Sequence, residues 1–265
     1  MATTSAAIPG KNSGTPVTEA HPMRLFWRTA EVLAVTTETP RTRSLVLRVP
    51  DWPGHSAGQH VDLRLTAEDG YQTQRSYSIA SPPERPEVVL TIERIDDGEV
   101  SPYLTQEVRP GDELELRGPI GGYFTWTATS SSPLQLVAGG SGVVPLMAML
   151  RHRAHHRPRA PARLLSSWRT RDSIIYLEEL QQLTSDDREL EIVHTLTRES
   201  PSGWAGQHGR IGADMLRKFT FTPDQRPRVY VCGPTPFVES VADAMVLLGH
   251  PPFNIKTERF GPTGG

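Results

Sequence analysis

Apolar residues in the first half of the chain alternate with polar ones, a period of two that is typical of strands with one buried face. The alternation predicts six strands, separated by proline and glycine turns, at residues 31–36, 42–49, 60–65, 74–79, 87–94 and 113–117. Short strands that follow one another this closely, with turn signals between them, favour a small closed antiparallel barrel. The barrel would span about residues 24–126.

The pattern of the second half changes to short apolar runs that are each followed by helical spacing. Strands are predicted at residues 134–137, 162–167, 190–195, 228–232 and 254–258. Helices are predicted to begin near Pro145, at residues 176–183 and 213–219, and after Pro234. Strands that alternate with helices argue for a parallel sheet with helices on both faces.

The predicted fold therefore has two domains. An antiparallel β-barrel covers residues 23–128, and an α/β parallel-sheet domain covers residues 129–265. Residues 1–22 consist mainly of Ala, Thr, Ser, Pro and Gly without an apolar core segment, so we expect a disordered leader and not a signal peptide.

Composition excludes several classes of protein. A net charge of -2 gives no electrostatic case for nucleic acid, and no apolar run has the length of a membrane span, so the cytoplasm is the default location. The single cysteine, Cys232, excludes an internal disulfide, a four-cysteine zinc site and a self-contained iron–sulfur cluster. We therefore expect no metal among the cofactors. The protein is also expected to be a monomer.

A glycine turn lies between the first strand and the first helix of the second domain. Residues 139–142 are Gly-Gly-Ser-Gly, and Pro145 follows where a helix would begin. A turn without side chains at a helix N-terminus offers free backbone N–H groups to a pyrophosphate. The match to G-x-G-x-x-G is incomplete, so a merely structural turn stays the alternative at this point.

Two further stretches could hold phosphate. In residues 71–79, Arg75 and Tyr77 share one strand face while Ser76 and Ser78 share the other, and an arginine beside a tyrosine can bind a phosphate next to an aromatic ring. Residues 98–104 predict a loop that enters a short helix with Ser101 as N-cap. A surface strand and an ordinary capped turn are the alternatives.

The strand at residues 162–167 bears on which nucleotide is bound. Dinucleotide folds that bind NAD usually place a carboxylate at the end of this strand to bind the ribose. This chain instead offers Ser167 and Arg169, whose hydroxyl and guanidinium groups suit a 2′-phosphate. The pattern favours NADP, with NAD as the alternative because Asp172 is close by. The arginine- and histidine-rich run at residues 151–163 is predicted to be a solvated helix end and loop.

Four motifs in this order resemble the ferredoxin–NADP reductase-like flavoprotein reductases. Arg-Ser-Tyr-Ser at residues 75–78 is similar to the family's flavin motif R-x-Y-S, and the glycine turn at residues 139–145 is similar to its pyridine-nucleotide loop. Cys-Gly-Pro at residues 232–234 is similar to its nicotinamide-side motif, and Glu-Arg-Phe at residues 258–260 to its terminal E-x-aromatic. The resemblance covers about residues 24–265.

The resemblance implies a flavin-binding barrel that holds FAD and a second domain that binds NADP, or NAD. It implies that Arg75 holds the flavin pyrophosphate, that Tyr77 packs on the flavin, and that Phe260 covers its other face. The catalytic residues that it implies are Ser78, Cys232, Glu258 and Phe260. The predicted cofactor-binding residues are Arg75, Ser76, Tyr77, Ser78, Ile92, Gly98, Val100, Ser101, Gly140, Ser141, Gly142, Pro145, Ser167, Arg169, Cys232, Gly233, Pro234 and Phe260.

The resemblance also implies a reaction. Hydride from NADPH, or NADH, would reduce the flavin, and electrons would pass to an external protein such as a ferredoxin or an oxygenase component, because the chain has no cysteine cluster of its own. Two alternatives stay open. One is a reductase of a small molecule such as a flavin or quinone, and the other is a non-catalytic flavin- or nucleotide-binding subunit.

Overall fold

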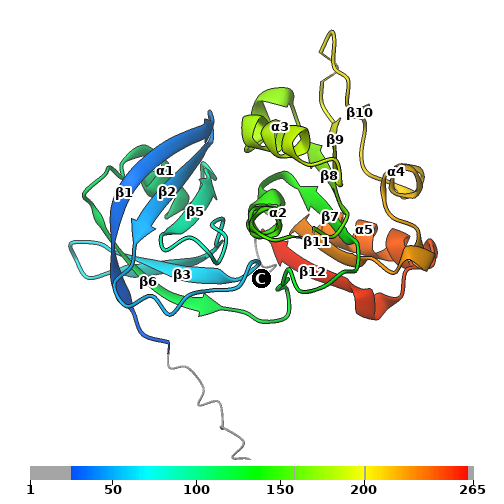
Figure 1. Ribbon diagram of the computed structural model, residues 1–265. Helices are drawn as coiled ribbons and strands as arrows, with labels where there is room; N and C mark the ends of the chain where they lie inside the picture. The colour runs from blue at the N-terminus through cyan, green and yellow to red at the C-terminus, as the bar shows by residue number, and fades with distance from the viewer. Residues whose placement is uncertain (1–24, 158, 200, 262–265) are drawn as a thin grey trace, which may run out of the picture.

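The computed structural model describes residues 25–157, 159–199 and 201–261, and in it two sheets form the centres of two halves of the chain (Figure 1). The first sheet is antiparallel, with the strand order β4-β3-β6-β1-β2-β5. Its strands are β1 (Arg28–Thr39), β2 (Thr42–Arg48), β3 (His60–Thr66), β4 (Gln72–Ser78), β5 (Val88–Glu93) and β6 (Glu113–Ile120). The predicted leader lies outside the described residues.

The first sheet curls until its two edge strands meet. Just past the end of β4, Ile79 pairs with Leu90 of β5 in an antiparallel bridge, and Ala80 N donates to Val89 O at 2.8 Å. The alternating apolar residues of the strands point into this curled sheet, where Leu45, Leu63 and their neighbours are fully buried. The period of two in the sequence therefore produces a barrel, as predicted.

The second sheet is parallel, with the strand order β10-β9-β8-β7-β11-β12. Its strands are β7 (Leu134–Gly139), β8 (Ala162–Trp168), β9 (Leu190–Leu196), β10 (Gln207–His208), β11 (Arg228–Pro234) and β12 (Ile255–Phe260). The α-helices of the described residues are α1 (Ser101–Gln106) in the barrel half, and α2 (Val143–His155), α3 (Leu177–Asp186), α4 (Ala213–Phe219) and α5 (Thr235–Leu247) around the parallel sheet.

Successive residues of β7 show how both faces of this sheet are covered. Leu136 belongs to the core that contains α2 and α3, whereas Val137 belongs to the core that contains α4 and α5. Both side chains are fully buried, which explains why this strand reads as a continuous apolar run and not as an alternation. The fold class is thus the predicted one, a barrel followed by a doubly covered parallel sheet.

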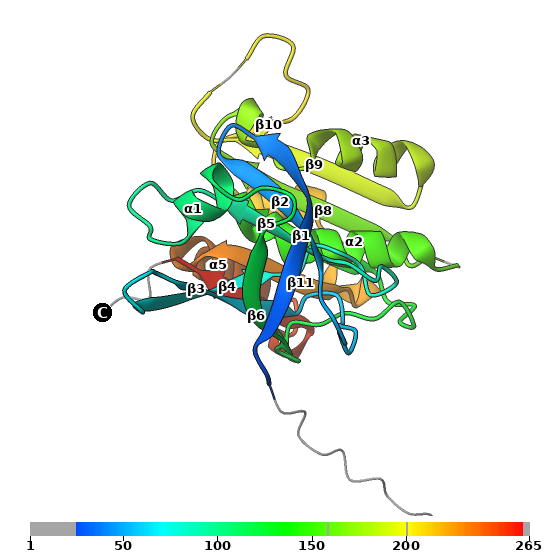
Figure 2. The same ribbon diagram turned by 90° about the vertical axis from the view of Figure 1, so that its left-hand side faces the viewer.

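Helix α2 lies between the two halves (Figure 1), and in the view from the barrel side the strands of the barrel lie in front of it (Figure 2). Its residues from Val143 to Leu150 are buried, and they share one core with Ala57, Ala80 and Val89 of the barrel half. Because this core is continuous, the two halves pack as one body through α2. Among the residues that the structure describes, no helix combines the length and the apolar character that crossing a bilayer requires.

Two local predictions were wrong. The run at residues 151–163 is not simply solvated, because Arg153 is buried and donates to Asp187 Oδ2 at 2.6 Å, and His152 is buried as well. Ser101 is not the N-cap of α1, since Val100 occupies that position and Ser101 is the first helical residue. Arg153 is buried by a partner 34 residues along the chain, whereas the Ser101 hydroxyl is occupied by the backbone N–H of Ile95, six residues earlier in the same loop.

Candidate functional site

The glycine turn at the end of β7 is packed against the corresponding turn at the end of β11. A Cβ atom built on Gly142 would lie 2.1 Å from the carbonyl oxygen of Cys232, and one built on Gly139 would lie 2.8 Å from the ring of Phe237. No side chain fits at Gly142, where the near atom is backbone, and a side chain at Gly139 would require the Phe237 ring to move. Gly140, with φ +54°, has nothing within 4 Å of such a Cβ, so the turn is closed on one side and open on the other. Pro145 lies in the first turn of α2.

Ser167 lies directly beside this turn because β8 pairs with β7 in parallel, and Ser167 is the register partner of Gly139. Arg169 follows on the exposed surface, where it makes no ion pair with any other described residue. Ser166, in contrast, points inward, where its hydroxyl lies 2.7 Å from His194 Nδ1 and accepts from Trp168 Nε1 at 2.9 Å. The turn thus has one hydroxyl and one free guanidinium at its edge.

A pocket of about 520 Å³ lies against β9, close to these residues. Its lining includes Arg171, Gln181, His194 and Trp204. Burial lowers the pKa of His194 to about 4, so this ring is neutral at ordinary pH. Sequence reasoning missed this pocket, because Trp204 reaches β9 from a loop whose course no local pattern indicates.

Arg75 reaches across from β4 to the loop that precedes α1. Its Nη2 lies 3.4 Å from Glu99 Oε2, and the same carboxylate oxygen accepts from Thr73 Oγ1 at 3.2 Å. Arg75 and Ser76 are exposed, whereas Tyr77 is half-buried and burial raises its pKa to about 12. The structure therefore brings together two of the predicted phosphate-binding stretches, residues 75–78 and 98–101.

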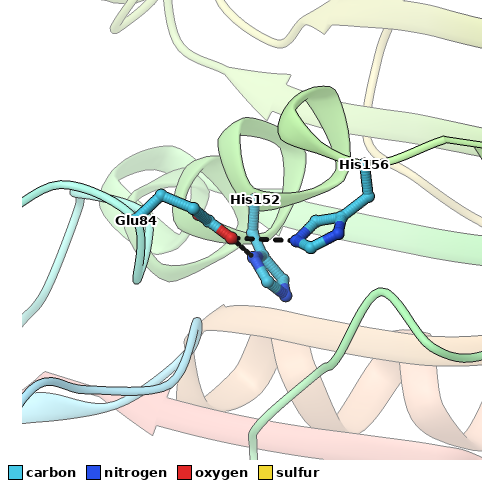
Figure 3. Close-up of side chains that lie close together, drawn as sticks. All are labelled: Glu84, His152 and His156. Atoms are coloured by element: carbon cyan, nitrogen blue, oxygen red, sulfur yellow. Dashed lines mark hydrogen bonds and ion pairs between the residues drawn. The ribbon is translucent and has the colours of Figure 1, made fainter.

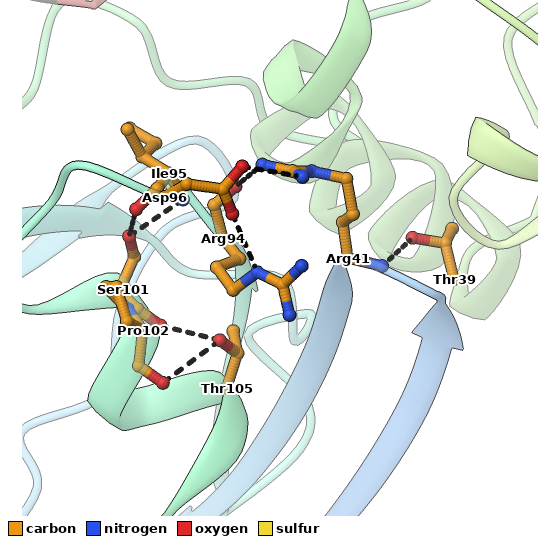
Figure 4. Close-up of polar contacts among 8 residues, drawn as sticks. All are labelled: Thr39, Arg41, Arg94, Ile95, Asp96, Ser101, Pro102 and Thr105. Atoms are coloured by element: carbon orange, nitrogen blue, oxygen red, sulfur yellow. Dashed lines mark hydrogen bonds and ion pairs between the residues drawn. The ribbon is translucent and has the colours of Figure 1, made fainter.

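The side chains of the loop before α1 are already engaged (Figure 4). Ser101 Oγ accepts from the backbone N–H of Ile95 at 3.0 Å, and Val100 is buried. Either residue can thus reach a ligand only through its backbone, where the first N–H groups of a helix lack intrahelical acceptors. On the other side of this loop Arg41 and Arg94 both pair with Asp96 at 3.0 Å. Ile92 is buried in the barrel core.

Three of the four predicted catalytic residues, namely Ser78, Cys232 and Glu258, lie where the two halves meet. Cys232 and Glu258 are register partners on β11 and β12, and Cys232 Sγ donates to Glu258 Oε2 at 3.9 Å. On the barrel side, His60 is the register partner of Ser78, and its Nδ1 lies 3.9 Å from Glu258 Oε1. His60 therefore connects the two pairs, and it was not predicted from the sequence.

Burial dominates the electrostatics of this cluster. It raises the pKa of Glu258 to about 7, raises the pKa of the Cys232 thiol and lowers the pKa of His60. Near neutral pH the thiol and the ring are uncharged, and Glu258 is about half protonated. The cluster can therefore hold or release one proton without forming an ion pair. Phe260 follows on the same strand face as Glu258 and is partly exposed.

The register of a hairpin is the signal that could have revealed His60. Residues 60–66 and 72–78 pair around a short turn, so the first residue of one strand must face the last residue of the other. The sequence marks the turn only by Asp69 and Gly70, which leaves the register open by a residue or two.

Comparison with known proteins agrees with this geometry. Residues 30–125 match a model described as an oxidoreductase FAD-binding domain, and residues 136–243 match one described as an oxidoreductase NAD-binding domain. Ferredoxin–NADP reductase B of Sorangium cellulosum is 34% identical over 87% of this chain and 96% of its own length. The chain belongs to the ferredoxin–NADP reductase-like family of FAD- and NAD(P)-binding flavoprotein reductases. The family resemblance and both cofactor classes are confirmed.

Other relatives are longer than the matched region. The glycine betaine monooxygenase reductase subunit of Chromohalobacter salexigens is 34% identical over 78% of this chain and 56% of its own length. NADH oxidoreductase HCR of Escherichia coli is 34% identical over 84% of this chain and 65% of its own length. The chain thus spans less than two thirds of either of these two relatives. The fold is also that of a cytochrome P450 reductase of Amycolatopsis, with a TM-score of 0.80 at 24% identity, over 91% of this chain and 71% of that one.

Proposed function

We propose that the protein oxidises NADPH and transfers the electrons to a separate redox protein. The observation that carries this proposal is the cluster of Ser78, His60, Glu258 and Cys232 at the meeting point of an FAD-binding half and an NAD-binding half. A bound flavin would supply the chemistry, because it takes up two electrons as hydride and gives them up one at a time.

The residues of the chain fit both cofactors. Arg75 and the backbone N–H groups near Val100 suit the two negative charges of a flavin pyrophosphate. The glycine turn is packed against the end of β11 on one side, and its other side, at Gly140, is open to a nicotinamide dinucleotide. We propose that Tyr77 packs on the flavin, that Phe260 shields it and makes room for the nicotinamide, and that Glu258 holds a proton beside the site with Cys232 and Ser78. Ile92 would contribute only from within the barrel core.

NADPH is favoured over NADH by the edge of the glycine turn. Ser167 and Arg169 offer a hydroxyl and a guanidinium that makes no ion pair with another described residue. The carboxylate of Glu199 also lies beside the end of β8, but it accepts from the backbone N–H of Arg171. A 2′-phosphate would gain a charge-assisted hydrogen bond there, which NADH cannot make. The relatives include both kinds, since one is named a ferredoxin–NADP reductase and another an NADH oxidoreductase.

For the acceptor we propose a ferredoxin or the oxygenase component of a larger system. The single cysteine of the chain cannot hold an iron–sulfur cluster, so a cluster that accepts the electrons would lie outside this chain. The names of relatives support this class, since one is the reductase subunit of a monooxygenase and another a ferredoxin–NADP reductase. Reduction of a free flavin or quinone, and a non-catalytic subunit, are the competing functions.

Anaerobic titration of the FAD-loaded protein with NADPH tests the proposal. We expect the visible flavin absorbance to bleach, and to return when two equivalents of an oxidised one-electron ferredoxin are added, because the reduced flavin holds two electrons. A protein that holds FAD but does not bleach with NADPH or NADH would be a binding subunit. Bleaching followed by rapid oxidation with a quinone, but not with any ferredoxin or oxygenase component, would identify a small-molecule reductase. A monomeric state and a cytoplasmic location stay predictions, to be checked by light scattering and by cell fractionation.

A further inference from the structure

Away from the cofactor site, three side chains of metal-ligating type meet between the two halves of the chain (Figure 3). Glu84 comes from the segment between β4 and β5, whereas His152 and His156 come from the C-terminal end of α2. Glu84 Oε1 lies 2.6 Å from His152 Nδ1 and 2.9 Å from His156 Nε2. One potential ligand atom from each residue lies within 4.8 Å of the other two.

The composition and spacing of this cluster suit a transition metal. His152 lies in the last turn of α2, and His156, four residues later, is the C-cap of this helix with an extended backbone (φ -110°, ψ 155°), so the two imidazoles come from neighbouring positions at the end of one helix. A carboxylate from another segment completes a set of two nitrogens and one oxygen, which Zn²⁺ accepts with its fourth position open to water. Magnesium and calcium prefer oxygen ligands, so they suit this set poorly.

The cluster can open to the size that a metal needs. Zinc holds its ligands about 2.0–2.2 Å away, so ligand atoms in a tetrahedral site are roughly 3.3 Å apart. This is about 0.7 Å more than the 2.6 Å contact of Glu84 with His152 and about 0.4 Å more than its 2.9 Å contact with His156. Glu84 and His156 are exposed and can rotate by these amounts. His152 is fixed, because it is buried with its ring edge-on to Trp126 at 5.5 Å between centroids.

We propose that Glu84, His152 and His156 bind Zn²⁺ or a similar divalent transition metal, which ties the barrel half to α2. The expectation of no metal rested on the single cysteine, and a site built from histidine and glutamate lies outside that argument. Without a metal, the three side chains would simply hydrogen-bond, with Glu84 accepting from both rings. The two possibilities differ in whether the negative charge of Glu84 is needed. A metal ion needs this charge, whereas the two hydrogen bonds need only an oxygen that accepts them.

One hydrogen bond of His152 determines how tightly we expect the site to bind Zn²⁺. The backbone N–H of Ala128 donates to His152 Nε2 at 3.3 Å, which places the ring proton on Nδ1. A metal on Nδ1 moves that proton to Nε2 and breaks this long hydrogen bond. We therefore expect micromolar affinity and not the tighter binding of a preorganised zinc site, in which the second ring nitrogen donates to an acceptor.

Calorimetric titration of chelator-treated, FAD-loaded full chain with ZnCl₂ tests the site. We expect one equivalent to bind with micromolar affinity, and the melting temperature to rise by roughly 5 °C when free Zn²⁺ exceeds the dissociation constant about 100-fold. EDTA should reverse the shift, and MgCl₂ should not produce one. The absence of any Zn²⁺ binding up to submillimolar concentration would overturn the proposal.

Three variants assign the binding to these residues. Glu84→Gln keeps an oxygen that accepts both ring hydrogen bonds but removes the charge, and His156→Ala removes an exposed ligand, so each should weaken Zn²⁺ binding at least about tenfold. His155→Ala is the matched control, since His155 is an exposed histidine on the same helical turn that takes no part in the cluster. It should bind as the wild type does. Unchanged binding in both Glu84→Gln and His156→Ala would show that the metal binds elsewhere.

Discussion

Glu258 shows how the surroundings of one residue set its chemistry. Its carboxyl group would titrate near 4.5 in water, but burial raises its pKa to about 7. Neither neighbour offers a positive charge in compensation, because His60 is kept neutral by burial and Cys232 is an uncharged thiol. Such a titration suits the role proposed for Glu258, in which the carboxyl group would hold a proton beside the flavin at neutral pH.

The titration of Glu258 predicts a pH dependence of stability. Because folding raises the pKa of Glu258, the folded state binds this proton more tightly than the unfolded state does. Protonation of Glu258 therefore contributes fully to the free energy of unfolding below about pH 4.5, and this contribution is lost as the pH rises through 7. The loss is of the order of 3 kcal/mol at most. Glu258→Gln should flatten this part of the curve of unfolding free energy against pH, measured by urea unfolding.

The same variant should also remove the ionisation near pH 7 from the rate of flavin reduction by NADPH. Glu239→Gln, an exposed change on α5, is the control and should leave both profiles as in the wild type. A Glu258→Gln protein that keeps the ionisation near pH 7 in both measurements would assign it to another group.

Arg75 carries the prediction for flavin binding. Its guanidinium is exposed and, among the described residues, contacts its own strand and Glu99 alone, so Arg75→Ala should leave the fold intact. Loss of one charge-assisted phosphate contact should weaken FAD binding by about 2 kcal/mol, or roughly 30-fold. Fluorescence titration with FAD measures this. Arg85→Ala removes an arginine of similar exposure from the same half and should bind FAD normally, whereas wild-type affinity in Arg75→Ala would refute the role of Arg75.

At the scale of elements, periodicity in the sequence predicts most of the fold because each strand and helix buries a face of its own. The alternation of residues 42–49 is enough to locate β2, and the apolar run of residues 134–137 is enough to locate β7. The two-residue strand β10 was missed, since two residues carry no period. The wrong assignment of the run at residues 151–163 has a different cause, because its charged residues are paired with Glu84, Asp187 and other groups far along the chain.

The candidate site also contains residues that the local sequence predicts and residues that it does not. The glycine turn and Arg75 could be found because backbone geometry and phosphate chemistry restrict which residues can serve there. His60 could not, because its place beside Ser78 depends on the register of a hairpin and its place beside Glu258 on the packing of two domains. A local pattern fixes neither of these. What the sequence reveals is therefore the chemistry of each element, and what it conceals is the contacts between elements.

The end of β8 carries the prediction for nucleotide preference. Arg169→Ala should raise the KM for NADPH about tenfold and leave that for NADH almost unchanged, since only the 2′-phosphate distinguishes the two. Steady-state kinetics with both nucleotides checks this. The control is Arg188→Ala, an exposed arginine just before β9, at the opposite end of the parallel sheet. Equal losses with both nucleotides would mean that Arg169 contacts a group that they share.

For the whole molecule, the decisive feature is the layer of polar contacts that surrounds the shared core at α2. Arg151 on α2 donates to Ala80 O of the barrel half at 2.7 Å and to both carboxylate oxygens of Glu179 on α3, at 2.8 and 2.6 Å. It also lies over the ring of Tyr176, 4.8 Å from the ring centre, and Tyr176 OH donates to Thr91 Oγ1 of β5. One guanidinium therefore holds the barrel, α2 and α3 in a fixed arrangement.

Replacing this guanidinium tests whether the two halves depend on one another. Arg151→Met keeps much of the apolar stem but leaves Ala80 O and the Glu179 carboxylate without their partner, so we expect the protein to lose about 3 kcal/mol of stability. For a chain of this size that corresponds to a melting temperature lower by roughly 6–10 °C in differential scanning calorimetry. Arg217→Met breaks an ion pair with Asp214 that is largely exposed, and it should cost less than about 0.5 kcal/mol. If the two variants melted alike, the Arg151 contacts would be no stronger than a surface pair, and the apolar core around α2 alone would hold the two halves together.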